Sequence, residues 1–116
     1  MTRQRQQLGR KGEKQAAQYL RRLNYQILGC NVMSQFGEID ILAQDKNTLV
    51  IVEVKTKTNN EIGNPEDMVD WKKQQKLIRL AQEVNQNFPD FEVRVDVIAI
   101  QGKIIRHIIN AVEDER

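Results

Sequence analysis

The residues best suited to chemistry in this sequence are two carboxylates and a lysine, Asp40, Glu53 and Lys55. Glu53 and Lys55 are two positions apart, so their side chains share one face of an extended strand. In a hairpin whose loop is centred on Lys46-Asn47, paired positions have numbers that sum to 93. Asp40 is then directly opposite Glu53, with Cβ atoms about 5 Å apart.

Two carboxylates at that separation repel each other unless a proton or a cation lies between them. A hard ion such as Mg²⁺ or Mn²⁺ suits the pair, because Mg²⁺ takes one or two carboxylates and keeps several waters. Lys55 beside such a site would orient a water or stabilise charge on a phosphate. The same spacing also fits a solvent-facing hairpin with a cross-strand ion pair, since acid-x-Lys is a common string.

Two more charged residues lie on apolar helical faces. Glu13 shares a face with Ala16, Ala17 and Leu20, and Lys73 shares one with Leu77. A charge on such a face is costly unless it has a partner. A polar site between the helices and the sheet would supply partners for both. Each residue also has a simpler explanation: Glu13 is a favourable acid in a first helical turn, and the long side chain of Lys73 can extend its charge to solvent.

The periodicity of apolar residues predicts the elements that must position these side chains. A helix is expected over 12–23 and a longer one over 64–87, capped by Asn64 and Pro65. Strands are expected over 25–35, 38–43, 49–55, 91–100 and 103–109. The order α-β-β-β-α-β-β indicates an α/β fold, with helices packed on a mixed central sheet.

Length and composition limit the class of protein. The 116 residues, 40% of them hydrophobic, suit a single domain over 1–116, with a basic arm at 1–8 and an acidic tail at 110–116. A lone cysteine, Cys30, excludes an intrachain disulfide framework. Without a signal-peptide pattern or a membrane-length apolar run, a cytoplasmic location is expected.

The net charge of +2 hides an uneven distribution. Seven Lys and Arg residues and one Glu lie in the first 22 positions, a local charge of +6. This asymmetry permits contact with a polyanionic partner, although charge alone favours a solvated helix face and a frayed tail. The residues expected to contact nucleic acid are Arg3, Arg5, Arg10, Lys11 and Lys14.

Several motifs together resemble the YraN family of small bacterial proteins. They are Gly12-Glu13 with Ala16-Ala17, Gly37-Glu38-Ile39-Asp40, Val52-Glu53-Val54-Lys55-Thr56-Lys57, Gly63-Asn64-Pro65, Lys73 with Lys76, Ala81, and Arg94-Val95-Asp96-Val97. The family is placed by similarity in the PD-(D/E)XK nuclease superfamily, near archaeal Holliday-junction resolvases. The resemblance covers about residues 9–112 and implies a restriction-endonuclease-like α-β-β-β-α-β core.

The resemblance also implies roles for individual residues. Asp40 and Glu53 would be metal ligands, Lys55 the catalytic lysine, Glu13 the acid of the first helix, and Lys73 an auxiliary residue near the phosphate. By analogy, the substrate would be DNA, with branched DNA a candidate, and the active form a homodimer.

Three functions remain open at the level of sequence. The first is a Mg²⁺- or Mn²⁺-dependent endonuclease that hydrolyses phosphodiester bonds. The second is a nucleic-acid-binding module that keeps the nuclease fold without cleaving; a small interaction protein with an incidental charged cleft is a third, blander reading. Trp71, a single Trp among few aromatics, does not by itself indicate a platform for single strands.

Overall fold

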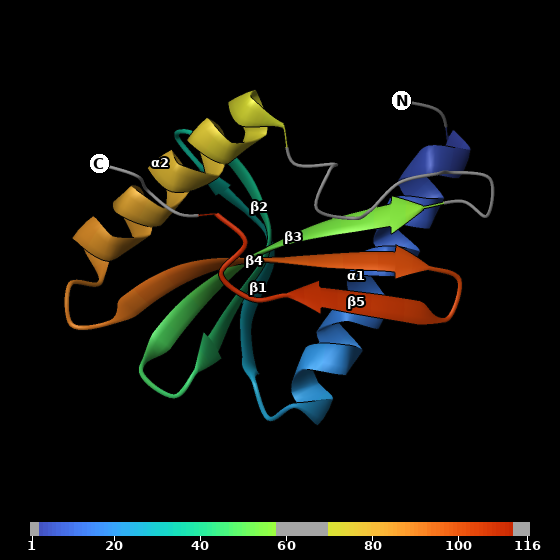
Figure 1. Cartoon of the computed structure of the whole chain (residues 1–116), viewed down its shortest axis with the longest axis horizontal. Coiled ribbons are helices and arrows are strands. Elements are labelled where there is room, and N and C mark those ends of the chain that lie inside the picture. The colour runs from blue at the N-terminus through green and yellow to red at the C-terminus, as the bar shows by residue number, and fades with distance from the viewer. Residues whose placement is uncertain (1–2, 58–69, 113–116) are drawn as a thin grey trace.

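The structure is a computed structural model that describes residues 3–57 and 70–112, with side chains from residue 9 onward. A five-stranded sheet lies between two helices, one on each face (Figure 1). The elements, in chain order, are α1 (Arg3–Arg22), β1 (Gln26–Ser34), β2 (Gly37–Asp45), β3 (Thr48–Lys57), α2 (Trp71–Asn87), β4 (Glu92–Gln101) and β5 (Ile104–Ile108). The predicted α/β class and element order are confirmed.

The main differences from expectation lie at the starts of the helices. The first helix begins at Arg3, so residues 3–8, expected to form an arm, belong to it. The second begins at Trp71, where the Asp70 side chain accepts a hydrogen bond from the Lys73 N–H at 2.9 Å. The predicted cap at Asn64 and Pro65 lies outside the described residues.

The strands lie in the order β1-β2-β3-β4-β5. All neighbouring pairs are antiparallel except β3 and β4, which are parallel. Parallel neighbours need a crossover connection, and α2 lies in the chain between these two strands. This mixed sheet is compatible with the restriction-endonuclease-like core that the sequence predicts.

Each face of the sheet has its own apolar core. The core under α1 comprises Ala16, Ala17, Leu20, Ile41, Ala43, Val50, Val52, Ile98 and Ile100. The core under α2 comprises Ile39, Leu49, Ile51, Leu77, Leu80, Val84, Val95, Val97 and Val112. Successive residues of β3 and β4 alternate between the two lists, as expected for strands that are buried on both faces.

Asp96 is a fully buried carboxylate in β4 with several hydrogen-bond partners. Its Oδ1 accepts from Arg94 Nε at 2.9 Å and from the Asn110 N–H at 3.0 Å, and its Oδ2 lies 2.7 Å from His107 Nε2. Burial raises the pKa of Asp96, but the hydrogen bonds from His107, Arg94 and Asn110 outweigh this effect and lower the pKa below its usual value. The network ties β5 and the chain after it to β4, so its role is structural.

Asp96→Asn should lower the free energy of unfolding by about 3 kcal/mol at pH 7, because it leaves buried cationic and polar partners without their carboxylate. The folded-state pKa lies below the ordinary value of 3.8, so this stabilisation is complete well above pH 4 and is lost as the pH falls through the folded-state pKa. Urea unfolding at pH 7 and pH 3 measures the difference in the free energy of unfolding between the wild type and Asp96→Asn. A difference of equal size at both pH values contradicts the assignment.

Candidate functional site

The candidate site lies where β2 and β3 separate. Their ladder runs from Asp45↔Thr48 to Ile41↔Val52, which confirms the predicted register as far as that pair. The ladder ends there, so Asp40 and Glu53 are not the directly opposed pair that was expected. Beyond the end of the ladder, the Oδ2 atom of Asp40 accepts a hydrogen bond at 2.9 Å from the Val54 N–H. The carboxylate thus replaces a backbone acceptor of β2, and it holds Asp40 in the opening between the two strands.

Glu53 is the buried anion of the site, with 5% of its surface exposed. Its Oε1 atom lies 2.8 Å from Lys73 Nζ and 3.3 Å from Lys55 Nζ. Removing one partner from a buried ion pair is strongly destabilising, so the two ammonium groups make the burial of Glu53 tolerable. Both lysine side chains remain about one quarter exposed, so they lie between the buried carboxylate and solvent.

Lys73 reaches the site because it belongs to the buried stripe of α2. Leu77, Leu80 and Val84 are the buried residues of this helix, and Lys73 precedes them at helical spacing. The Asp70 cap fixes the first turn through the Lys73 N–H. Lys73, whose charge on an apolar helical face was expected to need a partner, therefore has one in Glu53.

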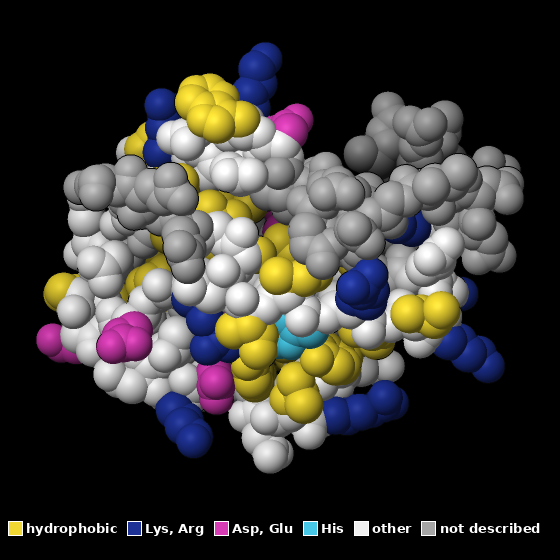
Figure 2. All heavy atoms as spheres, viewed as in Figure 1, with side chains coloured by type: hydrophobic (Ala, Val, Ile, Leu, Met, Phe, Trp, Pro, Cys, Tyr) yellow, Lys and Arg dark blue, Asp and Glu magenta, His cyan; other side chains and the backbone are white. Residues whose placement is uncertain are grey.

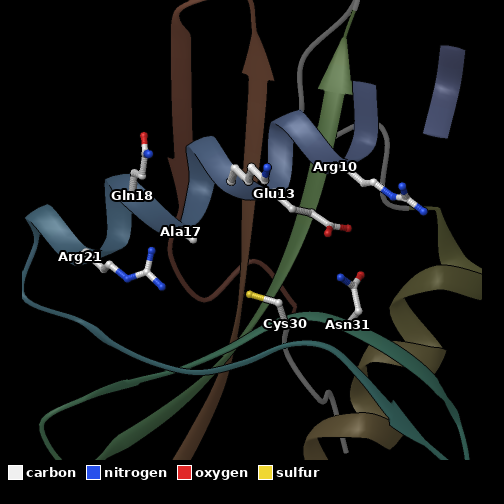
Figure 3. Close-up of a pocket in the computed structure, with 8 residues that line it drawn as sticks. Arg10, Glu13, Ala17, Gln18, Arg21, Cys30 and Asn31 are labelled. Carbon is white, nitrogen blue, oxygen red and sulfur yellow. The ribbon is translucent and has the colours of Figure 1, made fainter. Parts of the chain in front are cut away.

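Glu13 approaches from the opposite helix. Gly12 is buried, and a Cβ atom added there would overlap Oγ1 of Thr56 in β3. The missing side chain lets α1 lie close to β3, and the next residue, Glu13, extends between Arg10 and Asn31 (Figure 3). Its charge is near enough to raise the pKa of Asp40.

The pKa of Asp40 is raised from 3.8 to about 6. Burial is the largest cause, followed by the negative charge of Glu53, with Glu13 adding to it. The Val54 N–H and the Lys73 ammonium act in the opposite direction. The ion pairs of Glu53 and the charges that act on Asp40 bring five residues together, as the sequence predicted. We call them the charged cluster: Glu13, Asp40, Glu53, Lys55 and Lys73. Glu13 and Lys73 are distant in the chain from each other and from the β2–β3 hairpin.

The donor set of the charged cluster fits a hard divalent cation held by two carboxylates. Among residues 9–57 and 70–112, no group of three or more His, Cys, Asp and Glu side chains is arranged to hold a metal ion. Mg²⁺ does not require such a group, since one or two carboxylates and several waters satisfy it. Asp40 and Glu53 supply that number, and burial together with the negative charge of Glu53 raises the pKa of Asp40, so a cation beside the pair would be favourable.

The residues expected to contact nucleic acid fall into three groups. Arg10 and Lys14 line a cavity of about 430 Å³ between α1 and β1, together with Arg21 (Figure 3). Lys11 is exposed but does not line this cavity. The side chains of Arg3 and Arg5 lie outside the described part of the structure.

One feature was missed at the level of sequence. Phe36, in the turn between β1 and β2, lines a cavity together with Trp71 and the cations of α2. The only sequence signal for it was an aromatic residue in a two-residue turn, because 35 positions separate Phe36 from Trp71.

Comparison with known proteins places this fold and site in a family. The model of the Uncharacterised protein family UPF0102 matches residues 12–100. The chain belongs to the UPF0102 family, also called YraN. The matched range contains the whole charged cluster. No helix in the described residues has the length and apolar character needed to cross a membrane.

Three UPF0102 proteins illustrate the similarity. The one from Thermodesulfovibrio yellowstonii is 47% identical over 106 residues, which cover 90% of this chain and 95% of the relative. Those from Persephonella marina and Christiangramia forsetii are 45% and 44% identical, covering 89% and 90% of this chain and 90% and 92% of the relatives. The family assignment that the motifs suggested is therefore confirmed.

Gly12→Ala should destabilise this UPF0102 protein by about 1 to 3 kcal/mol, because the added methyl group overlaps Thr56 and forces α1 away from β3. Gly9→Ala is the matched control, since no atom lies within 4 Å of the added Cβ, and it should stabilise α1 by up to about 1 kcal/mol. Denaturant unfolding measures both, and Gly12→Ala combined with Thr56→Ala should recover most of the loss. Equal effects of the two alanines would contradict the close approach.

Asp40→Asn should stabilise the metal-free protein by about 1 to 2 kcal/mol at pH 8. Asparagine keeps an acceptor for the Val54 N–H but removes the charge that repels Glu53 and Glu13. Because the folded-state pKa is raised, ionised Asp40 costs stability as the pH rises from about 4 through about 6, and the gain should vanish at pH 4.

Urea unfolding in EDTA across this pH range measures the effect of Asp40→Asn. Glu38→Gln, an exposed acid on the same strand, is the control. A variant that is less stable than the parent at pH 8 would show that Asp40 is not electrostatically strained.

Proposed function

We propose that this UPF0102 protein is a Mg²⁺- or Mn²⁺-dependent nuclease that hydrolyses phosphodiester bonds in DNA. The observation that carries the proposal is the buried carboxylate of Glu53 in contact with two lysines, beside Asp40 and at an opening in the sheet. Asp40 has a strongly raised pKa in this partly enclosed site, and such a perturbed ionisable group beside charged partners is typical of catalytic centres. The sequence motifs that resemble those of PD-(D/E)XK nucleases support the same chemistry.

Each member of the charged cluster has a role in this proposal. Asp40 and Glu53 hold the cation, which when bound polarises the phosphate and stabilises its developing charge. Lys55 orients the attacking water and donates hydrogen bonds to the phosphate. Lys73 offsets the charge of Glu53 and lies near the phosphate, and Glu13 adds an acid from α1.

The hydrolysis places the oxygen of water on phosphorus and breaks the bond to one ester oxygen. One product is a phosphomonoester and the other is a free hydroxyl group. Arg10, Lys14 and Arg21 around the cavity between α1 and β1 would bind flanking phosphates without reading bases. Branched DNA as substrate and a homodimer as active form are finer parts of the same proposal.

Labelled single-stranded, duplex and four-way-junction DNA should be cut by the wild type in Mg²⁺ or Mn²⁺ and left intact in EDTA. Glu53→Gln and Lys55→Met should each lower the cleavage rate at least 100-fold, because the first removes a ligand of the proposed cation and the second removes the ammonium group that stabilises developing charge. Glu92→Gln, an exposed acid on β4, is the control and should cut at the wild-type rate.

Wild-type protein that binds these substrates without cutting any of them would contradict the nuclease proposal and support a non-catalytic binding module. Variants that cut as fast as the wild type would show that the activity arises elsewhere. Circular dichroism of each variant separates a lost site from a lost fold.

A further inference from the structure

We propose that the groove between α2 and the β1–β2 turn binds unpaired nucleotides of the substrate strand by base stacking. The groove encloses about 230 Å³ and is lined by Phe36, Trp71, Lys72, Gln75, Lys76 and Arg79. This inference rests on the proposed function, because it names the substrate class of the same site: DNA with a single-stranded segment next to the point of cleavage.

The aromatic side chains of the groove are exposed on the surface of the molecule. Trp71 is 71% exposed and Phe36 is 37% exposed, although both are large and apolar. They come from the first residue of α2 and from the turn after β1, so only the fold brings them to one cavity. Two aromatic faces beside one groove form the stacking platform that a single tryptophan could not provide.

The groove is held in place by a close contact between α2 and β2. Gly37 has a φ of 131°, a conformation that favours glycine, and the side chain of Lys76 lies where its Cβ would be. The far end of the Lys76 side chain, from Cδ to Nζ, therefore lies against the start of β2, directly after Phe36. This contact brings the turn close to the helix.

Charge complementarity favours nucleic acid as the occupant. Lys72, Lys76 and Arg79 lie at helical spacing on one face of α2, and none of the six described lining residues is acidic. The nearby Asp70 carboxylate caps the helix through the Lys73 N–H. Figure 2 shows a hydrophobic group at the start of α2 with Lys and Arg side chains on both sides and one acidic side chain on the right. Aromatic faces for bases and cations for phosphates are the two components of single-strand binding.

The position of the groove links it to the charged cluster. Lys72 lines the groove while its neighbour Lys73 contacts Glu53, so adjacent residues of α2 serve the groove and the charged cluster. On the other side, Phe36 and Asp40 lie near the start of β2, with Gly37 between them. A strand whose phosphate lies at the charged cluster therefore reaches the groove within a short distance along α2.

Trp71 is the only tryptophan of the chain, so its fluorescence reports on the groove directly. In EDTA, an oligothymidylate of about eight nucleotides should quench the emission saturably, and a blunt duplex should quench it much less. Phe36→Leu keeps the reporter and should weaken single-strand binding about tenfold. Phe88→Leu is the matched control, because Phe88 is an exposed aromatic residue at the other end of α2, and it should change nothing.

Anisotropy of a labelled oligothymidylate extends the test to Trp71 itself. Trp71→Ala should weaken binding about tenfold, and Trp71→Phe, which keeps an aromatic face, should recover most of the affinity. Lys72→Gln and Arg79→Gln should each reduce the slope of log K against log salt by about 0.7. Lys103→Gln, in the turn between β4 and β5, should leave the slope unchanged.

The inference is overturned if no single strand quenches Trp71, or if Phe36→Leu binds as tightly as the wild type. Its failure is distinct from failure of the proposed nuclease, because binding is measured without metal. A protein that cuts duplex DNA but shows no quenching keeps the nuclease and loses the groove. One that binds single strands through Phe36 and Trp71 but cuts nothing keeps the groove and loses the nuclease.

Discussion

The ion pairing of the buried Glu53 carboxylate with Lys55 and Lys73 is the interaction on which the site depends. A carboxylate with 5% exposure is stable only when cations stand beside it, and Lys55 and Lys73 supply them from β3 and α2. The ion pair with Lys73 therefore links the N-terminal turn of α2 to the sheet. A change at Glu53 affects the packing of this turn as well as the electrostatics of the site.

The opening between β2 and β3 explains why charged residues from both helices reach one place. A continuous sheet would separate the α1 face from the α2 face. Asp40 interrupts the ladder by accepting the Val54 N–H, and its pKa responds to Glu13 on one helix and to Lys73 on the other. The site is thus made by a local break in regular structure, which is a common position for functional residues.

Much of the site could be predicted because strand pairing and helical spacing are strong constraints. The two-residue loop at Lys46-Asn47 fixes the hairpin register, and that register carries Asp40 and Glu53 to the same end of the β2–β3 ladder. Lys73 was identified because it is a charge on an apolar face, and such a charge needs a partner.

Features that depend on how separate elements pack could not be predicted. The start of α2 at Trp71 depends on the Asp70 side chain, which accepts a hydrogen bond from the Lys73 N–H. The close approach of α1 depends on the absence of a side chain at Gly12 opposite Thr56. The shared cavity of Phe36 and Trp71 depends on the packing of Lys76 over Gly37.

The central claim is that Asp40 and Glu53 form one divalent cation site in the opening between β2 and β3. Paramagnetic broadening of backbone amide signals by Mn²⁺ tests it most directly, because Mn²⁺ replaces Mg²⁺ at oxygen sites. The account predicts broadening centred on Ile41 and Val54, saturable with Mn²⁺ and abolished by Asp40→Asn and by Glu53→Gln. Broadening that is scattered over surface acids, or that persists in both variants, would contradict it.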